Sequence, residues 1–99
     1  ERAYRAYALR TLGEIVSSEE PPAVEEAETH YREALVLAVD LEMRPLQARC
    51  HLGLGKLLQR VGRMDEAHAE LTTAITMLRE MGMTYWLPEA EAALGARSS

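Results

Sequence analysis

The sequence predicts an all-α fold, an α-solenoid in which about five helices stack as antiparallel pairs. Apolar residues recur at steps of three and four, and no segment alternates apolar and polar residues long enough to form a strand. Short connections between the expected helices place successive helices antiparallel to each other. The chain also repeats itself at a shift of 40 residues, which is typical of stacked helical hairpins. The residues that return are Ala27, Ala34, Met43, Leu54 and Gly55, found again as Ala67, Ala74, Met83, Leu94 and Gly95.

The composition is that of one globular domain. A chain of 99 residues with 47% hydrophobic residues can build a single core without disulfides, and Cys50 has no second cysteine to pair with. We expect one domain over residues 1–99, with a first repeat at 1–43 and a second at 44–83. Residues 84–99 begin a third repeat or form a capping helix.

Charge and hydropathy exclude two classes of partner. A net charge of -5 disfavours a nucleic-acid-binding surface, which needs clustered basic residues on a basic domain. No apolar run approaches the roughly 20 residues that span a bilayer, and the first residues do not form a signal peptide. We therefore expect no nucleic acid, no membrane contact and a cytoplasmic location.

The first pair of helices is separated by prolines. The first helix is expected from Arg2 to Ser17, since Pro21 and Pro22 cannot continue a helix but suit the opening turn of the next. The second is expected over residues 23–42. Its middle is apolar nearly all round, so we expect it to be the most buried helix.

Glycines end the next two helices. The third helix begins near Pro45, a residue favoured in the first turn, and Gly62 ends it as a left-handed cap. The fourth is expected over residues 64–81 and stops at Gly82. Thr84 is the expected N-cap of the fifth helix, which runs towards Leu94 with Pro88 in its first turn.

Small residues at fixed spacing suggest a known repeat family. The second unit has Leu54-Gly55 on one helix and Ala67, Leu71 and Ala74 on the next. This pattern resembles the tetratricopeptide repeat. The first unit shows the same pattern through Leu12-Gly13, Ala27, Tyr31 and Ala34. A repeat of about 40 residues instead of 34 departs from the family and implies longer helices.

The small residues have a steric role. Where two helices cross closely, a larger side chain would separate their backbones, so a glycine is kept inside a helix although it costs about 1 kcal/mol relative to alanine. We therefore expect Gly13 and Gly55 to lie at contacts between helices.

The resemblance implies a right-handed solenoid and a non-catalytic module for protein–protein interaction. The first helices of the units would line a concave groove, with Glu89 at its border. The candidate groove residues are Tyr7, Arg10, Glu14, Arg49, Leu52, Lys56, Gln59 and Arg60. Because Arg49, Lys56 and Arg60 are basic on an acidic protein, a peptide that carries carboxylates is the expected ligand. Solvated surface arginines are the competing interpretation.

A narrower resemblance concerns regulation. Residues 44–55 and 79–87 are similar to segments of large multidomain bacterial signalling proteins, in which such repeats follow cyclase, ATPase or transcription-factor domains. We expect the segment to belong to a longer protein. The alternative function is a sensor module that binds a small ligand and regulates an attached domain.

No chemical site is predicted. Metal binding would need several converging ligands, whereas His30, His51 and His68 fall on three different expected helices. Cys50 lacks a visible orienting group for nucleophilic catalysis. We therefore expect no catalytic residues, no metal and no cofactor. A small helical enzyme remains the third possibility and would need His51 for turnover.

The C-terminal helix suggests self-association. Ala90, Ala93 and Leu94 have no following helix to pack against, so we expect end-to-end contact between copies, as in a homodimer. Trp86 takes the place of Leu46 in the preceding unit. Packing against the fourth helix is the favoured role for Trp86, and an exposed anchor for a partner is the alternative.

Overall fold

The computed structural model describes residues 1–96 and confirms an all-α fold. Five helices and no strands occur in this range. They are α1 (Arg2–Ser17), α2 (Val24–Asp40), α3 (Arg44–Arg60), α4 (Met64–Glu80) and α5 (Leu87–Ala96). Residues 97–99 of the expected third repeat lie outside the described residues. None of the described helices has both the length and the apolar character to cross a bilayer.

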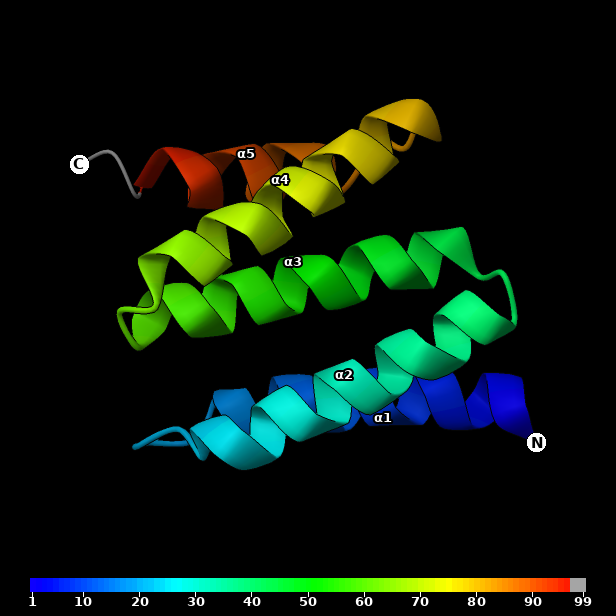
Figure 1. The fold of residues 1–99 in the computed structure, drawn as a ribbon, viewed down its shortest axis with the longest axis horizontal. Coiled ribbons are helices and arrows are strands. Elements are labelled where there is room, and N and C mark those ends of the chain that lie inside the picture. The colour runs from blue at the N-terminus through cyan, green and yellow to red at the C-terminus, as the bar shows by residue number, and fades with distance from the viewer. Residues whose placement is uncertain (97–99) are drawn as a thin grey trace.

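Successive helices run antiparallel and pack against their neighbours in the chain (Figure 1). The most extensive contacts are within the pairs α1/α2 and α3/α4, and α2 joins the two pairs by packing against α3. In the view of Figure 1, α1 lies behind α2 and α5 lies behind α4. Helices α1 and α5 therefore lie on the same side of the molecule, and the packing of neighbouring helices is consistent with a helical repeat.

The helix ends repeat every 20 residues. Glu42, Gly62 and Gly82 all have positive φ, at 55°, 84° and 66°, and each follows a helix of 17 residues. After each, the next backbone N–H donates to the carbonyl of the third-last helix residue, as Arg63 does to Leu58 at 2.9 Å. The predicted caps at Gly62 and Gly82 are confirmed. A left-handed glutamate at the equivalent position in α2 was not predicted, and it ends that helix at Asp40 instead of residue 42.

An ion pair recurs in both helix pairs. Arg2 at the start of α1 pairs with Asp40 at the end of α2. Arg44 at the start of α3 pairs with Glu80 at the end of α4, with 2.9 Å between nitrogen and oxygen. The two pairs are thus alike in tertiary contacts as well as in sequence.

The glycines lie at the helix contacts, as predicted. A Cβ atom at Gly13 would lie 3.0 Å from the ring of Tyr31, and one at Gly55 would lie 2.6 Å from Leu71. Both partners come from the second helix of the same pair. The absence of a side chain at these two positions therefore sets how closely the paired helices approach.

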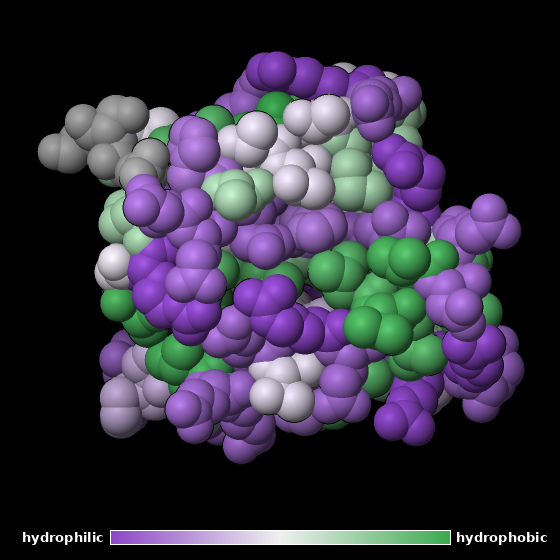
Figure 2. Space-filling model, viewed as in Figure 1, coloured by the Kyte–Doolittle hydropathy of each residue, from purple (hydrophilic) through white to green (hydrophobic). Residues whose placement is uncertain are grey.

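The expectation that the second helix is the most buried is wrong. Eight residues of α3 are buried, against four of α2, since α3 contacts α1, α2 and α4. The apolar middle of α2 has a face without a covering helix, and Val36 and Val39 are exposed there. Figure 2 shows apolar side chains gathered over the C-terminal half of α2 on this side of the molecule.

The fifth helix starts later than predicted, at Leu87. A helix capped by Thr84 would need the backbone N–H of residue 88 for its first turn, and Pro88 has none. The first hydrogen bond of α5 therefore runs from the N–H of Ala90 to the carbonyl of Trp86, at 3.1 Å.

Candidate functional site

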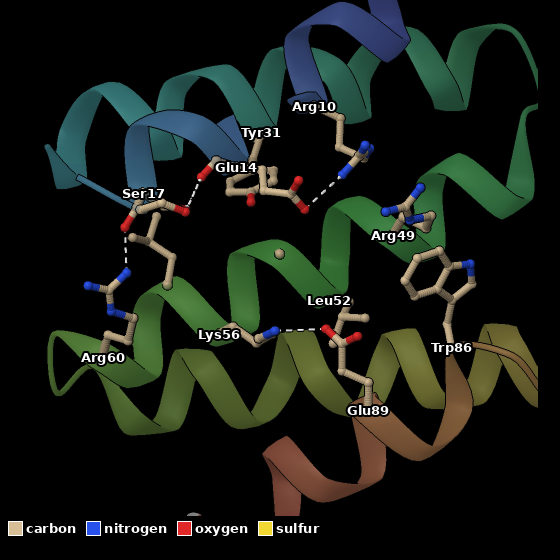
Figure 3. A pocket seen from close by; sticks show the side chains of 13 residues that line it. Arg10, Glu14, Ser17, Tyr31, Arg49, Leu52, Lys56, Arg60, Trp86 and Glu89 are labelled. Atoms are coloured by element: carbon tan, nitrogen blue, oxygen red, sulfur yellow. Dashed lines mark hydrogen bonds and ion pairs between the residues drawn. The ribbon is translucent and has the colours of Figure 1, made fainter. Parts of the chain in front are cut away.

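A groove of about 410 Å³ lies on the side of the molecule formed by α1, α3 and α5. Figure 3 shows side chains from all three helices directed towards it, with α3 between the other two. Its lining residues are Arg10, Glu14, Ser17, Ser18, Tyr31, Arg49, Leu52, Gly53, Lys56, Leu57, Arg60, Trp86 and Glu89.

Most of the predicted groove residues lie here. Of the eight candidates, six line the groove, and Glu89 borders it as expected; the six are Arg10, Glu14, Arg49, Leu52, Lys56 and Arg60. Tyr7 instead lines a separate hollow on the outer face of α1, with Tyr4. Gln59 donates its amide to the carbonyl of Ala93 at 2.8 Å and so ties α3 to α5.

Six lining residues were not foreseen from the sequence as groove residues: Ser17, Ser18, Tyr31, Gly53, Leu57 and Trp86. Tyr31 was assigned to the repeat pattern of the helix contacts, yet its ring passes between α1 and α3 and reaches the groove. Trp86 is one turn before Glu89 in sequence, and this spacing was the available signal that both face the groove.

Three of the four basic side chains in the groove have partners within the protein. Lys56 Nζ lies 2.7 Å from a carboxylate oxygen of Glu89. Arg10 pairs with Glu14 at 3.5 Å, and Arg60 donates to the backbone carbonyl of Ser17. These contacts link α1, α3 and α5 around the groove (Figure 3).

Arg49 differs from these three. No carboxylate oxygen of residues 1–96 lies within ion-pair distance of its guanidinium, whose Cζ stands 4.0 Å from the centre of the Trp86 ring. Stacking on an indole is a favourable contact for a guanidinium, but it leaves the N–H donors free for a ligand. Burial, followed by the positive charge of Arg10, lowers the pKa of Arg49.

Arg10 adds a second incompletely paired donor. Its side chain is only 12% exposed, and Nε has no hydrogen-bond partner in the part of the chain that is described. A buried donor without a partner is costly, and it is satisfied when an acceptor enters. Arg10 and Arg49 therefore make this part of the groove a place where an anion is favourable.

The buried ring of Tyr31 forms part of the base of the groove. Tyr31 is 3% exposed, and a Cβ atom at Gly53 would lie 2.5 Å from its ring. Burial raises the pKa of Tyr31, and a hydrogen bond with Ser17 offsets part of this effect. The phenol therefore stays neutral and contributes a flat, uncharged surface below the arginines.

Comparisons of the chain with protein-family models, with curated proteins and with solved structures find no match.

The described residues do not assemble a chemical centre. Among residues 1–96, no group of three or more His, Cys, Asp and Glu side chains is placed to hold a metal ion. His51 Nδ1 lies 2.6 Å from Glu70, but this pair joins α3 to α4 and does not line the groove. Cys50 is fully buried, and burial raises the pKa of its thiol to about 11. Its thiolate is thus disfavoured at neutral pH.

Proposed function

We propose that this protein is a non-catalytic interaction module of the tetratricopeptide type, which binds a carboxylate-bearing segment of another protein in the groove between α1, α3 and α5. The repeated helix pairs and the glycines at their contacts support the repeat assignment. A right-handed solenoid is part of this proposal. An acidic segment fits better than a basic or apolar one because the groove residues Arg10, Arg49, Lys56 and Arg60 outnumber Glu14 and Glu89.

The single observation that carries the proposal is Arg49. Its guanidinium is partly desolvated and lies near the like charge of Arg10, and it forms no ion pair within residues 1–96, although Glu14 and Glu89 act on it from a greater distance. A ligand carboxylate would supply the missing counter-charge, and charge-assisted hydrogen bonds of this kind are about twice as strong as neutral ones. Lys56 and Arg60 have internal partners, so they contribute to the positive field more than to direct recognition.

The test is a pair of peptides that differ only in charge. An unstructured peptide containing several Asp and Glu residues is titrated into the protein by calorimetry, beside the same peptide with Asn and Gln instead. The acidic peptide should bind, and its affinity should fall as salt is added. The amide peptide should bind at least about tenfold more weakly, as expected when a charged hydrogen bond is lost.

A matched pair of protein variants locates the binding. Arg49→Gln removes the unpaired charge in the groove, whereas Arg5→Gln removes an exposed charge of α1 that lies near Glu33. Arg49→Gln should abolish the preference for the acidic peptide, and Arg5→Gln should preserve it. Equal loss in both variants, with both still folded by circular dichroism, would reject the groove as the site.

A small-ligand sensor is the second candidate function. It is favoured by the volume of about 410 Å³, since pockets for small molecules measure roughly 300–1,000 Å³. A small di- or tricarboxylate such as citrate would use the same arginines. Tight citrate binding in the absence of any binding of the acidic peptide would favour the sensor.

Self-association is a separate proposal. Ala90 is fully buried against α4, and Ala93 and Leu94 pack against the same cluster, so the three residues contribute to the core of the described fold. The homodimer through the ends stays a prediction, and light scattering over a range of concentrations tests it. Binding in the groove does not depend on it.

A further inference from the structure

The outer face of α1 is apolar and exposed. Tyr4, Leu12 and Ile15 are 77%, 42% and 56% exposed, although each is a large apolar side chain. Tyr4, Ala8, Thr11 and Leu12, together with Tyr7, line a hollow of about 460 Å³ on this face. We define the α1 outer face as Tyr4, Ala8, Thr11, Leu12 and Ile15. None of these five residues lines the groove, so the face is not part of the site described above.

The internal repeat shows what such a face contacts. Gly13 and Gly55 make equivalent contacts, so a residue of α1 corresponds to the residue 42 positions later in α3. The counterparts of the α1 outer face are Leu46, Cys50, Gly53, Leu54 and Leu57. The four apolar side chains among them are buried to 2% exposure or less. The same face is thus covered in α3 and uncovered in α1.

The covering element in α3 is the second helix of the preceding pair. Leu46 and Cys50 pack in one cluster with Ala34 and Ala38 of α2. Leu54 and Leu57 pack in another cluster with two more residues of α2, Ala27 and Tyr31. The complement of this face is therefore the alanine-rich stripe of an amphipathic helix.

We propose that the α1 outer face binds an amphipathic helix with an alanine-rich stripe, lying on α1 as α2 lies on α3. The hollow on α1 receives this stripe, because small side chains let the helix backbone come close to Ala8 and Leu12. Because α2 packs antiparallel to α3, the bound helix should lie antiparallel to α1.

Thr11 sets a further requirement for the bound helix. Its counterpart is Gly53, where the Tyr31 ring fills the space of the missing side chain. Thr11 carries a β-branched side chain at that place on α1, so a ring in the position of Tyr31 would collide with it. The bound helix must therefore carry a small residue there, and it differs from α2 at this one position.

A second copy of this chain is not the occupant. The 17-residue helices α2 and α4 carry such a stripe, and each already packs against two other helices. Helix α5 also carries alanines, but its 10 residues are fewer than the α1 outer face spans from Tyr4 to Ile15. Helix α2 packs between α1 and α3, and α4 packs between α3 and α5. A second folded copy therefore offers no free alanine-rich stripe of matching length, and in this proposal the helix comes from a different polypeptide segment.

The experiment uses two synthetic peptides as probes. One has the sequence of residues 24–40, and the other has the same sequence with Tyr31→Ala. Each is added in excess to the ¹⁵N-labelled protein, because an isolated helix of this length is marginally stable and binds weakly. The substituted peptide should shift the amide signals of Ala8, Thr11 and Leu12. The unsubstituted peptide should bind at least about fivefold more weakly, the ratio expected for a steric conflict.

Protein variants distinguish specific binding at the α1 outer face from non-specific hydrophobic binding of the peptide. Thr11→Gly makes α1 resemble α3 at this position, so it should restore binding of the unsubstituted peptide. This comparison keeps the peptide unchanged and so removes any effect of its own helix propensity. Leu12→Glu should abolish binding of the substituted peptide. The control Val36→Glu, which changes an exposed apolar residue of α2, should leave the binding of the substituted peptide unaltered.

Three results would overturn the proposal. They are an absence of shifts with the substituted peptide, shifts that cluster outside α1, and concentration-dependent shifts on the α1 outer face without any peptide. The third would show that a second copy covers the face. The acidic-peptide titration tests the groove, which has different lining residues from the α1 outer face. Either proposal can therefore fail while the other holds.

Discussion

The ring of Tyr31 fills the space that a side chain at Gly53 would need. A Cβ atom at position 53 would lie 2.5 Å from the ring, well inside van der Waals contact. Tyr31 belongs to α2 and Gly53 to α3, so this contact joins the two helix pairs. Both residues also line the groove. The stability of the stack and the shape of the groove therefore depend on one contact.

Gly53→Ala should destabilise the protein by about 1–2 kcal/mol. A buried ring held on both sides cannot move away cheaply, and overpacking of this kind outweighs the gain in helix propensity from replacing glycine. Denaturation by urea, followed by circular dichroism, measures the change. The control is Gly95→Ala, whose Cβ would meet no atom within 4 Å and should leave the stability equal or higher. Equal stability of the two variants would contradict the steric argument.

Glu42→Gly should stabilise the protein by about 1 kcal/mol. Glu42 has φ of 55°, in the left-handed region that non-glycine residues enter at a cost of about 1–2 kcal/mol. Glycine already occupies the equivalent places at Gly62 and Gly82. The reverse change, Gly62→Ala, should destabilise by a similar amount, although a Cβ there would meet no neighbour. Thermal unfolding of both variants tests the pair, and a loss of stability in Glu42→Gly would reject the prediction.

The stability should depend on pH through Glu28. Its carboxylate accepts hydrogen bonds from Arg63 at 2.9 Å and from Arg32 at 2.8 Å, and these contacts, Arg63 first, lower the pKa of Glu28 below its ordinary value of 4.5. A lowered pKa in the folded state adds stability above the unfolded pKa, and this stability is lost as the pH falls through the folded value.

Glu28→Gln should therefore be less stable than the wild type by about 1 kcal/mol near neutral pH, and the difference should shrink below pH 4.5. Urea denaturation at a series of pH values measures it. Glu19→Gln serves as the control, because no ion pair of Glu19 is seen among residues 1–96. A difference that stays constant down to about pH 3 would show that Glu28 acts through packing instead of charge.

Trp86 should report binding in the groove. It is the only tryptophan, it is partly exposed, and Arg49 lies over its ring. An acidic peptide that engages Arg49 should cover the indole and shift its emission to shorter wavelength. Fluorescence titration measures this shift, and Arg49→Gln should lose it. The same shift with the amide form of the peptide would mean that binding does not depend on the negative charge of the peptide.

Cys50 should react only when the fold opens. The thiol is fully buried between α3 and α2, and burial raises its pKa to about 11. Because the thiolate is the reactive form, a disulfide reagent should label Cys50 slowly in the native protein and at once in denaturant. Labelling is followed by absorbance. Fast native labelling would mean that the contact between α2 and α3 opens readily.

Local pattern was enough to predict the helices. Periodicity gave α1 from Arg2 to Ser17 and located α2, α3 and α4 to within a few residues. Glycine caps and prolines were informative because they act on the backbone within a few residues. The start of α5 differs from the prediction because Pro88 lacks the N–H that a helix capped by Thr84 would need in its first turn.

The candidate site was predicted in part. The residues expected on the inner side of α1 and α3 do gather there, since helical spacing alone places them on one face. The same spacing assigned Tyr7 to the groove, but Tyr7 lines the separate hollow on the outer face of α1. The stacking of Arg49 on Trp86 could not be predicted from local sequence pattern either, since the two residues are 37 positions apart in the sequence.

The amino-acid order by itself determined the helices, their caps and the small residues at their contacts, because these follow from backbone geometry and short-range spacing. The tertiary structure alone decided that α3 is the most buried helix, that Arg49 has no ion pair among the described residues, and that the outer face of α1 is exposed. Burial and charge balance depend on which distant side chains come into contact, and packing in three dimensions fixes those contacts.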